Sequence, residues 1–283
     1  MNDKFIKRKS PAKVNLVLKV LGKRPDGFHE IASLIQRISL CDEMFFAVEG
    51  KGIRLSCPGG NIPENEGNIV WRAVKLFMEK TGKPEGVTIG IKKKIPVAAG
   101  LGGGSSNAAT ALVTLNELTG NELGREDLVE MGAFIGSDVP FFIYGGSAWA
   151  FGRGERLENV QGIPKLWFVI CNPGVALSTA DVYGGLRIGL TNRPVQYTIP
   201  RLETLSQVVD KLENDLEAVS ERLCRPIAEL KKRLMQVGSL GTLMSGSGPT
   251  VFGIFEGREE ARRAADLLSR ERCVPFVAYA CSI

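Results

Sequence analysis

The stretch Pro96-Val-Ala-Ala-Gly-Leu-Gly-Gly-Gly-Ser-Ser106 separates two segments with different periods of apolar residues. Before it, apolar residues alternate with polar ones at Val87, Ile89 and Ile91, which predicts a strand. After it, apolar residues recur every three or four positions, which predicts a helix that ends near Gly120. The residues that carry this second pattern are Ala108, Ala109, Leu112, Leu115 and Leu118. The sequence therefore predicts a glycine-rich loop, Pro96–Ser106, between a strand and the N-terminus of a helix.

This glycine-rich loop has the composition of an anion-binding loop. Glycine lets backbone amides approach a ligand closely, and the unpaired N–H groups of a first helical turn attract phosphate. The loop lacks the Gly-Lys-Ser/Thr ending of a Walker A motif, and Ser105 stands where a dinucleotide fingerprint needs its last glycine. We predict that the loop binds phosphate, that Ser105 and Ser106 cap the helix, and that their hydroxyls are available to phosphate or Mg²⁺. A tight strand-to-helix turn is the alternative.

The rest of the chain mixes strands and helices without a strict βαβ order. Further strands are expected at 14–20, 45–48, 167–171, 251–255 and 275–281, and helices at 69–78, 126–135, 202–219, 226–237 and 258–270. The polar stretch Thr191–Pro200 contains two prolines and is expected to be a loop. This order favours an α+β fold with two lobes, residues 1–157 and 158–283.

The charge of the chain is mildly positive. Its 36 basic and 31 acidic residues give a net charge of +5, and the longest purely basic run is Lys92–Lys94. Nucleic-acid-binding proteins usually gather basic residues in a stripe, so we expect no nucleic-acid partner, whereas a small anionic substrate suits this charge. The six cysteines form no C-x-x-C pair and His29 is the only histidine, which argues against a zinc site and leaves any metal ligands unidentified.

The N-terminus and the cysteines bear on location. Met1–Lys9 is charged and has no apolar core of the kind found in signal peptides. No apolar run approaches the ~18 residues that span a bilayer. Scattered cysteines without an export signal are typical of a reducing compartment. We therefore expect a cytoplasmic protein with no membrane partner, either a monomer or a homodimer.

Lys13 and Asn15 form a polar pair on the first predicted strand. They are two residues apart, so their side chains point to the same face, while Val14 and Leu16 point to the other. The pair could line a polar cleft. An exposed strand face is the alternative.

Asp138 lies in Gly136-Ser-Asp-Val-Pro-Phe-Phe142, where a short helix is predicted to begin near Pro140. Either Ser137 or Asp138 could cap that helix. The apolar flanks also place this carboxylate beside a buried region, where functional acids are often found. The sequence leaves both roles open.

Two further loops could contact a ligand. His29 follows the turn-like Pro25-Asp-Gly-Phe28 and could hydrogen-bond a ligand's ring while Phe28 stacks on it. An exposed loop histidine is the alternative. Ser245-Gly-Ser-Gly-Pro249 precedes a strand and is either a second backbone clamp or a tight turn.

Three segments, in this order, resemble the motifs of the GHMP kinase superfamily: Pro11-Ala-Lys-Val-Asn15, Pro96–Ala109 and Met244-Ser-Gly-Ser-Gly248. Three more resemble members that phosphorylate a cytidine-diphosphate-linked methylerythritol: Arg24-Pro-Asp-Gly-Phe-His-Glu30, Gly136–Phe142 and Gly152-Arg-Gly-Glu155. The resemblance covers essentially the whole chain. The departures are small: Ala98-Ala99 replaces a pair that commonly contains glycine, Ser137 replaces alanine, and Phe28 replaces a frequent tyrosine and so lacks its hydroxyl.

The resemblance implies a role for particular residues. Lys13 and Asp138 match the catalytic pair, and Asn15 matches a substrate contact. Phe28, His29 and Tyr183 match positions that hold cytosine. The ATP site is implied to comprise Pro96, Val97, Ala98, Ala99, Gly100, Leu101, Gly102, Gly103, Gly104, Ser105 and Ser106, with Asn68 and Lys93 near the nucleotide.

The resemblance also implies an N-terminal lobe like domain 2 of ribosomal protein S5 and a ferredoxin-like C-terminal lobe, with the active site between them. ATP and Mg²⁺ would be the cofactors, and the substrate a small molecule. Lys13 would reduce the charge cost at the acceptor oxygen, and Asp138 would orient or accept the hydroxyl proton. The alternatives are a GHMP kinase for homoserine, mevalonate or a sugar, a non-catalytic nucleotide sensor, and a nucleic-acid binder.

Overall fold

The computed structural model describes residues 5–186, 197–271, 274 and 276–283. The chain forms two compact units that interleave along the sequence. The first unit contains the residues up to Ala12 together with Cys41–Ile95 and Gly102–Gly145, and the second contains Lys13–Leu40, Pro96–Leu101 and the chain from Gly146 onward. Two long strands, β1 (Ile6–Lys23) and β2 (His29–Val48), contribute residues to both units.

The structure does not test some of the predictions made from the sequence. The division into lobes near residue 157 stays a prediction. Most of the loop predicted at Thr191–Pro200, together with Cys273, Pro275 and the first four residues, lies outside the described residues.

The first unit combines a small sheet with helices. Besides parts of β1 and β2, its elements are β3 (Gly52–Ser56), α1 (Ile69–Thr81), β4 (Gly86–Lys92), α2 (Gly103–Leu118), α3 (Arg125–Ile135) and α4 (Val139–Tyr144). The C-terminal half of β2 pairs antiparallel with β4, from Glu43 opposite Lys92 to Val48 opposite Val87, and β3 pairs parallel with β4. The rings of Phe46, Phe77 and Phe141 are fully buried and form part of the core.

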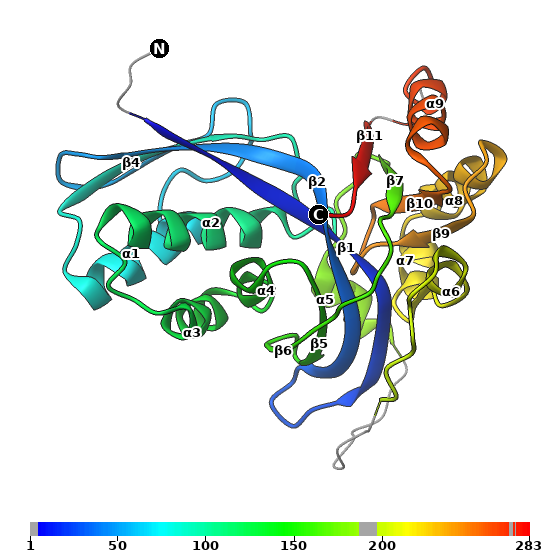
Figure 1. The fold of residues 1–283 in the computed structure, drawn as a ribbon, viewed down its shortest axis with the longest axis horizontal. Coiled ribbons are helices and arrows are strands. Elements are labelled where there is room, and N and C mark those ends of the chain that lie inside the picture. The colour runs from blue at the N-terminus through cyan, green and yellow to red at the C-terminus, as the bar shows by residue number, and fades with distance from the viewer. Residues whose placement is uncertain (1–4, 187–196, 272–273, 275) are drawn as a thin grey trace. The chain divides into compact units, whose positions relative to one another are not determined.

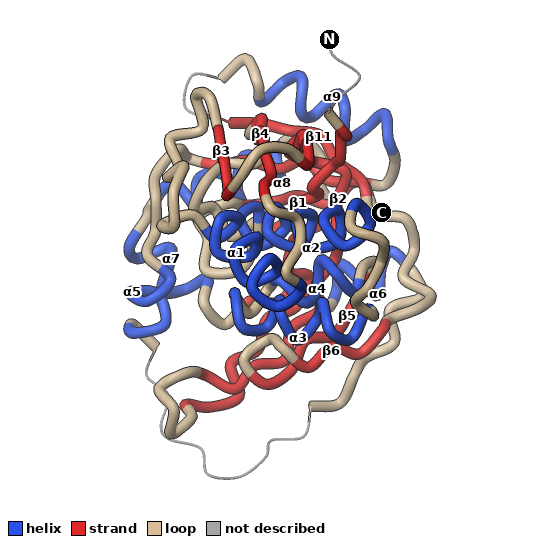
Figure 2. Tube along the Cα trace, turned by 90° about the vertical axis from the view of Figure 1, so that its left-hand side faces the viewer, coloured by secondary structure: helices blue, strands red, loops and turns tan. Residues whose placement is uncertain are grey.

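Helices α1 and α2 pack side by side (Figure 2). The Asn68 side chain caps α1 by accepting a 2.9 Å hydrogen bond from the backbone N–H of Val70. Helix α2 begins at Gly103, and its N-cap residue Gly102 has a φ of 68°. The prediction that Ser105 and Ser106 cap α2 is therefore wrong, because the helix begins two residues before Ser105.

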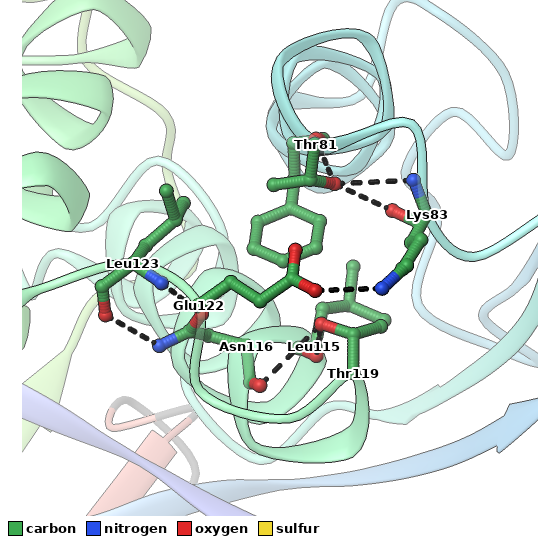
Figure 3. A network of polar contacts seen from close by, with 8 residues as sticks. Thr81, Lys83, Leu115, Asn116, Thr119, Glu122 and Leu123 are labelled. Atoms are coloured by element: carbon green, nitrogen blue, oxygen red, sulfur yellow. Dashed lines mark hydrogen bonds and ion pairs between the residues drawn. The ribbon is translucent and has the colours of Figure 1, made fainter.

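Polar contacts join the C-terminal ends of α1 and α2 (Figure 3). Lys83, just after α1, forms a 2.6 Å ion pair with Glu122, which follows α2. The buried Asn116 side chain accepts a 3.0 Å hydrogen bond from the Leu123 N–H and donates a 2.9 Å bond to the Leu123 carbonyl. Since the C-terminal ends meet here, the two helices run in the same direction and their N-terminal ends lie together at the opposite end.

The second unit contains an antiparallel sheet in the order β11-β7-β10-β9, against which α8 and α9 pack (Figure 1). Besides parts of β1 and β2, its elements are β5 (Ser147–Gly152), β6 (Arg156–Asn159), β7 (Trp167–Asn172), α5 (Thr179–Gly184), α6 (Leu205–Asp210), β8 (Glu213–Asn214), α7 (Glu217–Leu223), α8 (Pro226–Gln236), β9 (Gly241–Met244), β10 (Val251–Phe255), α9 (Arg258–Leu268) and β11 (Phe276–Cys281). The N-terminal half of β2 pairs antiparallel with β5, from Ile31 opposite Gly152 to Gln36 opposite Ser147.

Several predicted elements are confirmed almost to the residue, including α3, β7 and β10. The helix predicted over 202–219 is wrong: α6, β8 and α7 occupy that range. Glu213 and Asn214 pair parallel with β1, and the Asp215 carboxylate accepts a 2.8 Å hydrogen bond from the Val20 N–H. These tertiary bonds hold the segment extended. In the part of the chain described, no helix is both long and apolar enough to cross a bilayer.

Candidate active site

The polar pair on β1 is buried. Lys13 and Asn15 are each only 4% exposed, so the alternative of an exposed strand face is wrong. The Lys13 ammonium donates a 2.6 Å hydrogen bond to Oδ1 of Asn15. The Asn15 amide nitrogen donates to Oγ of Ser33 at 2.8 Å, and Ser33 in turn donates to the carbonyl of Val17. Ser33 therefore fixes the orientation of the Asn15 amide, with its oxygen toward Lys13.

The first half of the glycine-rich loop lies against the Ser245–Gly248 turn. Gly100 has a φ of 74°, and a Cβ atom there would lie 2.1 Å from the carbonyl oxygen of Ser245. The Ser245 hydroxyl donates a 2.9 Å hydrogen bond to the Gly100 carbonyl and accepts a 3.3 Å bond from the Asn15 N–H. A Cβ on Gly246 would lie 3.4 Å from Nζ of Lys13. The structure thus brings together the three segments that the sequence singled out.

Asn214 holds the Ser245–Gly248 turn in place. Its amide nitrogen donates 2.8 Å hydrogen bonds to the carbonyls of Met244 and Gly246, and its side chain is buried. The Ser220 hydroxyl donates a 3.1 Å bond to the Ser247 carbonyl. Sequence reasoning missed Asn214 and Ser33, because a single polar residue on a short strand or an apolar strand has no local signature.

The second half of the loop forms the start of α2 in the first unit. A Cβ on Gly103 would lie 3.2 Å from Nζ of Lys93, and one on Gly104 would lie 3.5 Å from Cγ2 of Ile69, the residue after Asn68. Lys93 and the N-terminus of α1 therefore flank the first turn of α2. Gly100 and Gly102 adopt positive φ without strain, whereas Ala98, with a φ of 51°, holds a conformation that is strained for a residue with a side chain, as is often found at functional loops.

The two serines of the loop differ in environment. Ser106 is fully buried, and its hydroxyl accepts a 2.8 Å hydrogen bond from the Ser10 hydroxyl. Ser105 is half-buried. The hydroxyl of Ser106 is therefore part of the interior of the unit, and Ser105 is the better placed of the two for a ligand.

Asp138 occupies the N-cap position of α4, but its side chain makes no capping hydrogen bond with that helix. Its turn lies near the start of α1, because a Cβ on Gly136 would lie 3.3 Å from Cδ1 of Ile69. The capping role that the sequence left open is therefore absent. Asp138 belongs to the first unit and Lys13 to the second.

His29 stands at the start of β2 and is half-buried, so it is not the exposed loop histidine of the alternative reading. Its ring stacks on that of Tyr183 from α5, with centroids 4.9 Å apart. The guanidinium of Arg153 lies 4.9 Å from the ring centroid of Phe28. Burial, and to a smaller extent the charge of Lys23, lower the pKa of His29 below its ordinary value. Its imidazole is therefore neutral at pH 7 and offers one donor and one acceptor.

Among the residues that the structure describes, no three His, Cys, Asp or Glu side chains gather closely enough to hold a metal ion.

Comparisons with known proteins place the chain in a family. The model of the GHMP kinases N terminal domain matches residues 68–146, and that of the GHMP kinases C terminal domain matches residues 198–274. A 4-diphosphocytidyl-2-C-methyl-D-erythritol kinase of Syntrophus aciditrophicus (strain SB) is 48% identical over 94% of this chain and 95% of that protein.

Solved structures agree with this placement. The crystal structure of a 4-(cytidine 5'-diphospho)-2C-methyl-D-erythritol kinase matches with a TM-score of 0.83 and 36% identity, over 98% of this chain and 99% of that one. A homoserine kinase from Cytophaga hutchinsonii ATCC 33406 has a TM-score of 0.71 at 21% identity over 100% of this chain and 96% of that one, which shows a shared fold alone. The predicted α+β GHMP kinase fold is confirmed, and the protein is a kinase that acts on a small molecule. The chain belongs to the 4-diphosphocytidyl-2-C-methyl-D-erythritol kinase family of the GHMP kinases.

Proposed function

We propose that this kinase transfers the γ-phosphoryl group of ATP to the 2-hydroxyl of 4-diphosphocytidyl-2-C-methyl-D-erythritol, a step toward isoprenoid precursors. The observation that carries the proposal is the hydrogen bond between Ser245 and Gly100, beside the buried Lys13–Asn15 pair. The Ser245 hydroxyl also accepts from the Asn15 N–H, so it joins three motif segments that are far apart in the sequence. The 48% identity to a kinase with this substrate in its name supports the choice of acceptor.

The glycine-rich loop Pro96–Ser106 would hold the ATP phosphates. Backbone N–H groups at the start of α2 point outward from the helix, and the helix dipole favours negative charge there. Lys93 and Asn68 flank this end of α2 and would add a positive charge and an amide. A Mg²⁺ ion carried by the nucleotide would neutralise phosphate charge, and the Ser105 hydroxyl would be available to it, since Mg²⁺ usually takes few protein ligands and keeps several waters.

Lys13 and Asp138 would act on the acceptor hydroxyl. Asn15 and Ser33 hold the Lys13 ammonium in one orientation, so its charge is available to the acceptor oxygen without reorganisation. Asp138 lies at the N-cap position of α4 and would orient the hydroxyl or accept its proton.

His29, Tyr183 and Phe28 would recognise the cytosine ring. The His29 and Tyr183 rings stack too closely to admit a third ring between them. The base would therefore lie outside this stacked pair, with Phe28 against its face and neutral His29 hydrogen-bonded to its edge. Phe28 is half exposed beneath Arg153 and offers an apolar surface next to a positive charge.

We also propose that the enzyme works in the cytoplasm as a monomer or a homodimer, without a nucleic-acid or membrane partner. The mild charge of +5 and the lack of a basic stripe support this.

ADP release, measured with each acceptor at equal concentration, tests the function. The acceptors are the cytidine-linked substrate, homoserine, mevalonate and no acceptor. We expect turnover with the cytidine-linked substrate alone, and ³¹P NMR should show a new phosphate monoester. Equal turnover with homoserine or mevalonate would indicate a different GHMP kinase, and ATP binding without turnover would indicate a nucleotide sensor.

A further inference from the structure

A buried polar cluster lies behind the first turn of α2, and at its centre is Asp42 on β2. The Asp42 side chain is fully buried and forms an ion pair with Lys93, whose side chain is 10% exposed. Oδ1 of Asp42 accepts hydrogen bonds from the backbone N–H groups of Lys94 at 2.7 Å and Ile95 at 2.9 Å. Oδ2 accepts from Lys93 and, at 3.0 Å, from the Asn107 amide. One carboxylate therefore binds both the Lys93 side chain and the backbone where the glycine-rich loop begins.

The Lys93 ammonium is held close to the helix start. Besides Asp42, it donates a 3.2 Å hydrogen bond to Oδ1 of Asn107 on α2. Its Nζ lies 3.2 Å from the position that a Cβ on Gly103 would occupy, and any side chain at Gly103 would displace it. An ammonium group has three N–H donors. With two of them directed to Asp42 and Asn107, the third is available to a phosphate oxygen at the N-terminus of α2.

The burial of this pair suggests a use beyond stability. Exchanging a buried ion pair for apolar side chains of similar volume is often neutral or stabilising, so an ion pair of this kind does little for stability by itself. A lysine side chain has four rotatable bonds, and in solution its ammonium samples many positions. Three hydrogen bonds, from the backbone N–H groups of Lys94 and Ile95 and from the Asn107 amide, fix the Asp42 carboxylate, and the carboxylate in turn fixes the Lys93 ammonium.

We propose that Asp42 is a positioning residue for the nucleotide, which acts through Lys93 by holding its ammonium at the first turn of α2 against a phosphate oxygen of ATP. This inference rests on the proposed ATP site but not on the identity of the acceptor. Asp42 touches neither substrate, and its effect on ATP requires Lys93.

Binding measured without the acceptor tests the inference. We would determine the affinities of ATP and adenosine by calorimetry for the wild type, Asp42→Asn, Lys93→Met and the double variant. Asparagine can still accept from the N–H groups of Lys94 and Ile95 but lacks the charge. We expect Asp42→Asn to weaken ATP binding roughly 10- to 100-fold, the range for one hydrogen bond to a charged group, and adenosine binding less than about twofold. In the Lys93→Met background, Asp42→Asn should change ATP affinity less than about twofold.

Glu43→Gln is the matched control. Glu43 is the next residue on β2 and pairs with Lys94 at 2.9 Å, but outside the cluster. Its loss should leave ATP affinity unchanged. If Asp42→Asn does not fold, Asp42→Glu keeps the charge and displaces it by one methylene group, and the same selective loss of ATP binding is expected.

Three results would overturn the inference: equal losses of ATP and adenosine affinity, an effect of Asp42→Asn that is the same with and without Lys93, or no effect on ATP. Failure of the wild type to bind ATP would instead contradict the proposed function. Wild-type ATP binding without turnover of the cytidine-linked acceptor would leave the role of Asp42 intact and change only the acceptor.

Discussion

The Ser245 hydroxyl donates a 2.9 Å hydrogen bond to the carbonyl of Gly100, which lies 145 residues earlier in the chain. The contact is so close that Gly100 can carry no side chain, because a Cβ there would lie 2.1 Å from the Ser245 carbonyl oxygen. The turn at Gly100 and the Ser245–Gly248 turn therefore constrain each other's backbone conformation. This contact decides the geometry of the first half of the glycine-rich loop.

Gly100→Ala should raise the KM for ATP, an effect that the strain of a positive φ at alanine would not produce by itself. We expect the KM for ATP to rise at least about tenfold, because the loop must move away from Ser245. Gly82→Ala is the control: Gly82 has a similar φ of 70° but open space around its Cβ position. That variant should lose about 1–2 kcal/mol of unfolding free energy at an unchanged KM for ATP. Steady-state kinetics and thermal unfolding measure both, and equal KM values for the two variants would contradict the loop assignment.

Asp138→Asn should reduce kcat about 10²–10⁴-fold, which is the usual loss when a general base is removed. Asparagine keeps the shape, and the Asp138 side chain makes no capping bond with α4 that the substitution could remove, so stability should change little. The KM values should also change little, because the interaction matters most in the transition state.

Asp127→Asn provides the matched control for Asp138→Asn. Oδ2 of Asp127 accepts a 3.0 Å hydrogen bond from the Gly124 N–H, so this carboxylate does cap α3. We expect the kcat of the Asp127→Asn variant to stay within twofold of wild type, because asparagine caps helices about as well as aspartate. A near-normal kcat for Asp138→Asn would contradict the proposed catalytic role of Asp138.

His29→Gln should raise the KM for the cytidine-linked substrate far more than the KM for ATP. The site would lose a ring and one of its hydrogen bonds, and the partner groups would be left unpaired. Steady-state kinetics at pH 7.5 measure both constants. Equal rises in the two would show that His29 is structural.

The lowered pKa of His29 adds a pH dependence with a definite sign. Between the folded pKa and about 6.5, the unfolded chain binds more protons at this position than the folded protein does. The contribution of His29 to stability is therefore full above pH 6.5 and is lost as the pH falls through the folded pKa. Urea unfolding from pH 5 to 8 should show a steeper loss toward acid for wild type than for His29→Gln. Parallel curves would contradict the lowered pKa.

Asn116→Ala should destabilise the first unit without affecting catalysis. Its buried amide makes two hydrogen bonds to the Leu123 backbone, and their loss leaves buried polar groups unpaired, at a cost of about 1–3 kcal/mol (Figure 3). Glu122→Gln removes only an exposed ion pair with Lys83 and should cost less than about 1 kcal/mol. Both variants should keep the wild-type KM for ATP, because these contacts lie at the end of α2 opposite the glycine-rich loop. A raised KM in Asn116→Ala would show coupling along the helix.

Much of this protein could be predicted from local sequence. Apolar periodicity located α3, β7 and β10, because one face of each element is buried and its spacing follows the backbone repeat. The composition of Pro96–Ser106 located the loop, since only glycine accepts φ values like those of Gly100 and Gly102 without strain. The family resemblance supplied the roles predicted for Lys13, Asp138 and His29.

Other features depend on contacts between residues far apart in the chain. The prediction of a helix over 202–219 was wrong because Glu213 and Asn214 pair with β1. Helix propensity depends on local sequence and carries no information about such a pairing. Ser106 looked like a cap but is bonded to Ser10, 96 residues earlier. Asp42 and Asn214 showed no pattern along the chain, since each acts through partners supplied by other elements. Local periodicity reports which side of an element is buried, whereas the partner of a buried polar group is set only when the chain closes on itself, and for that reason the residues that orient this site could be found only in the tertiary structure.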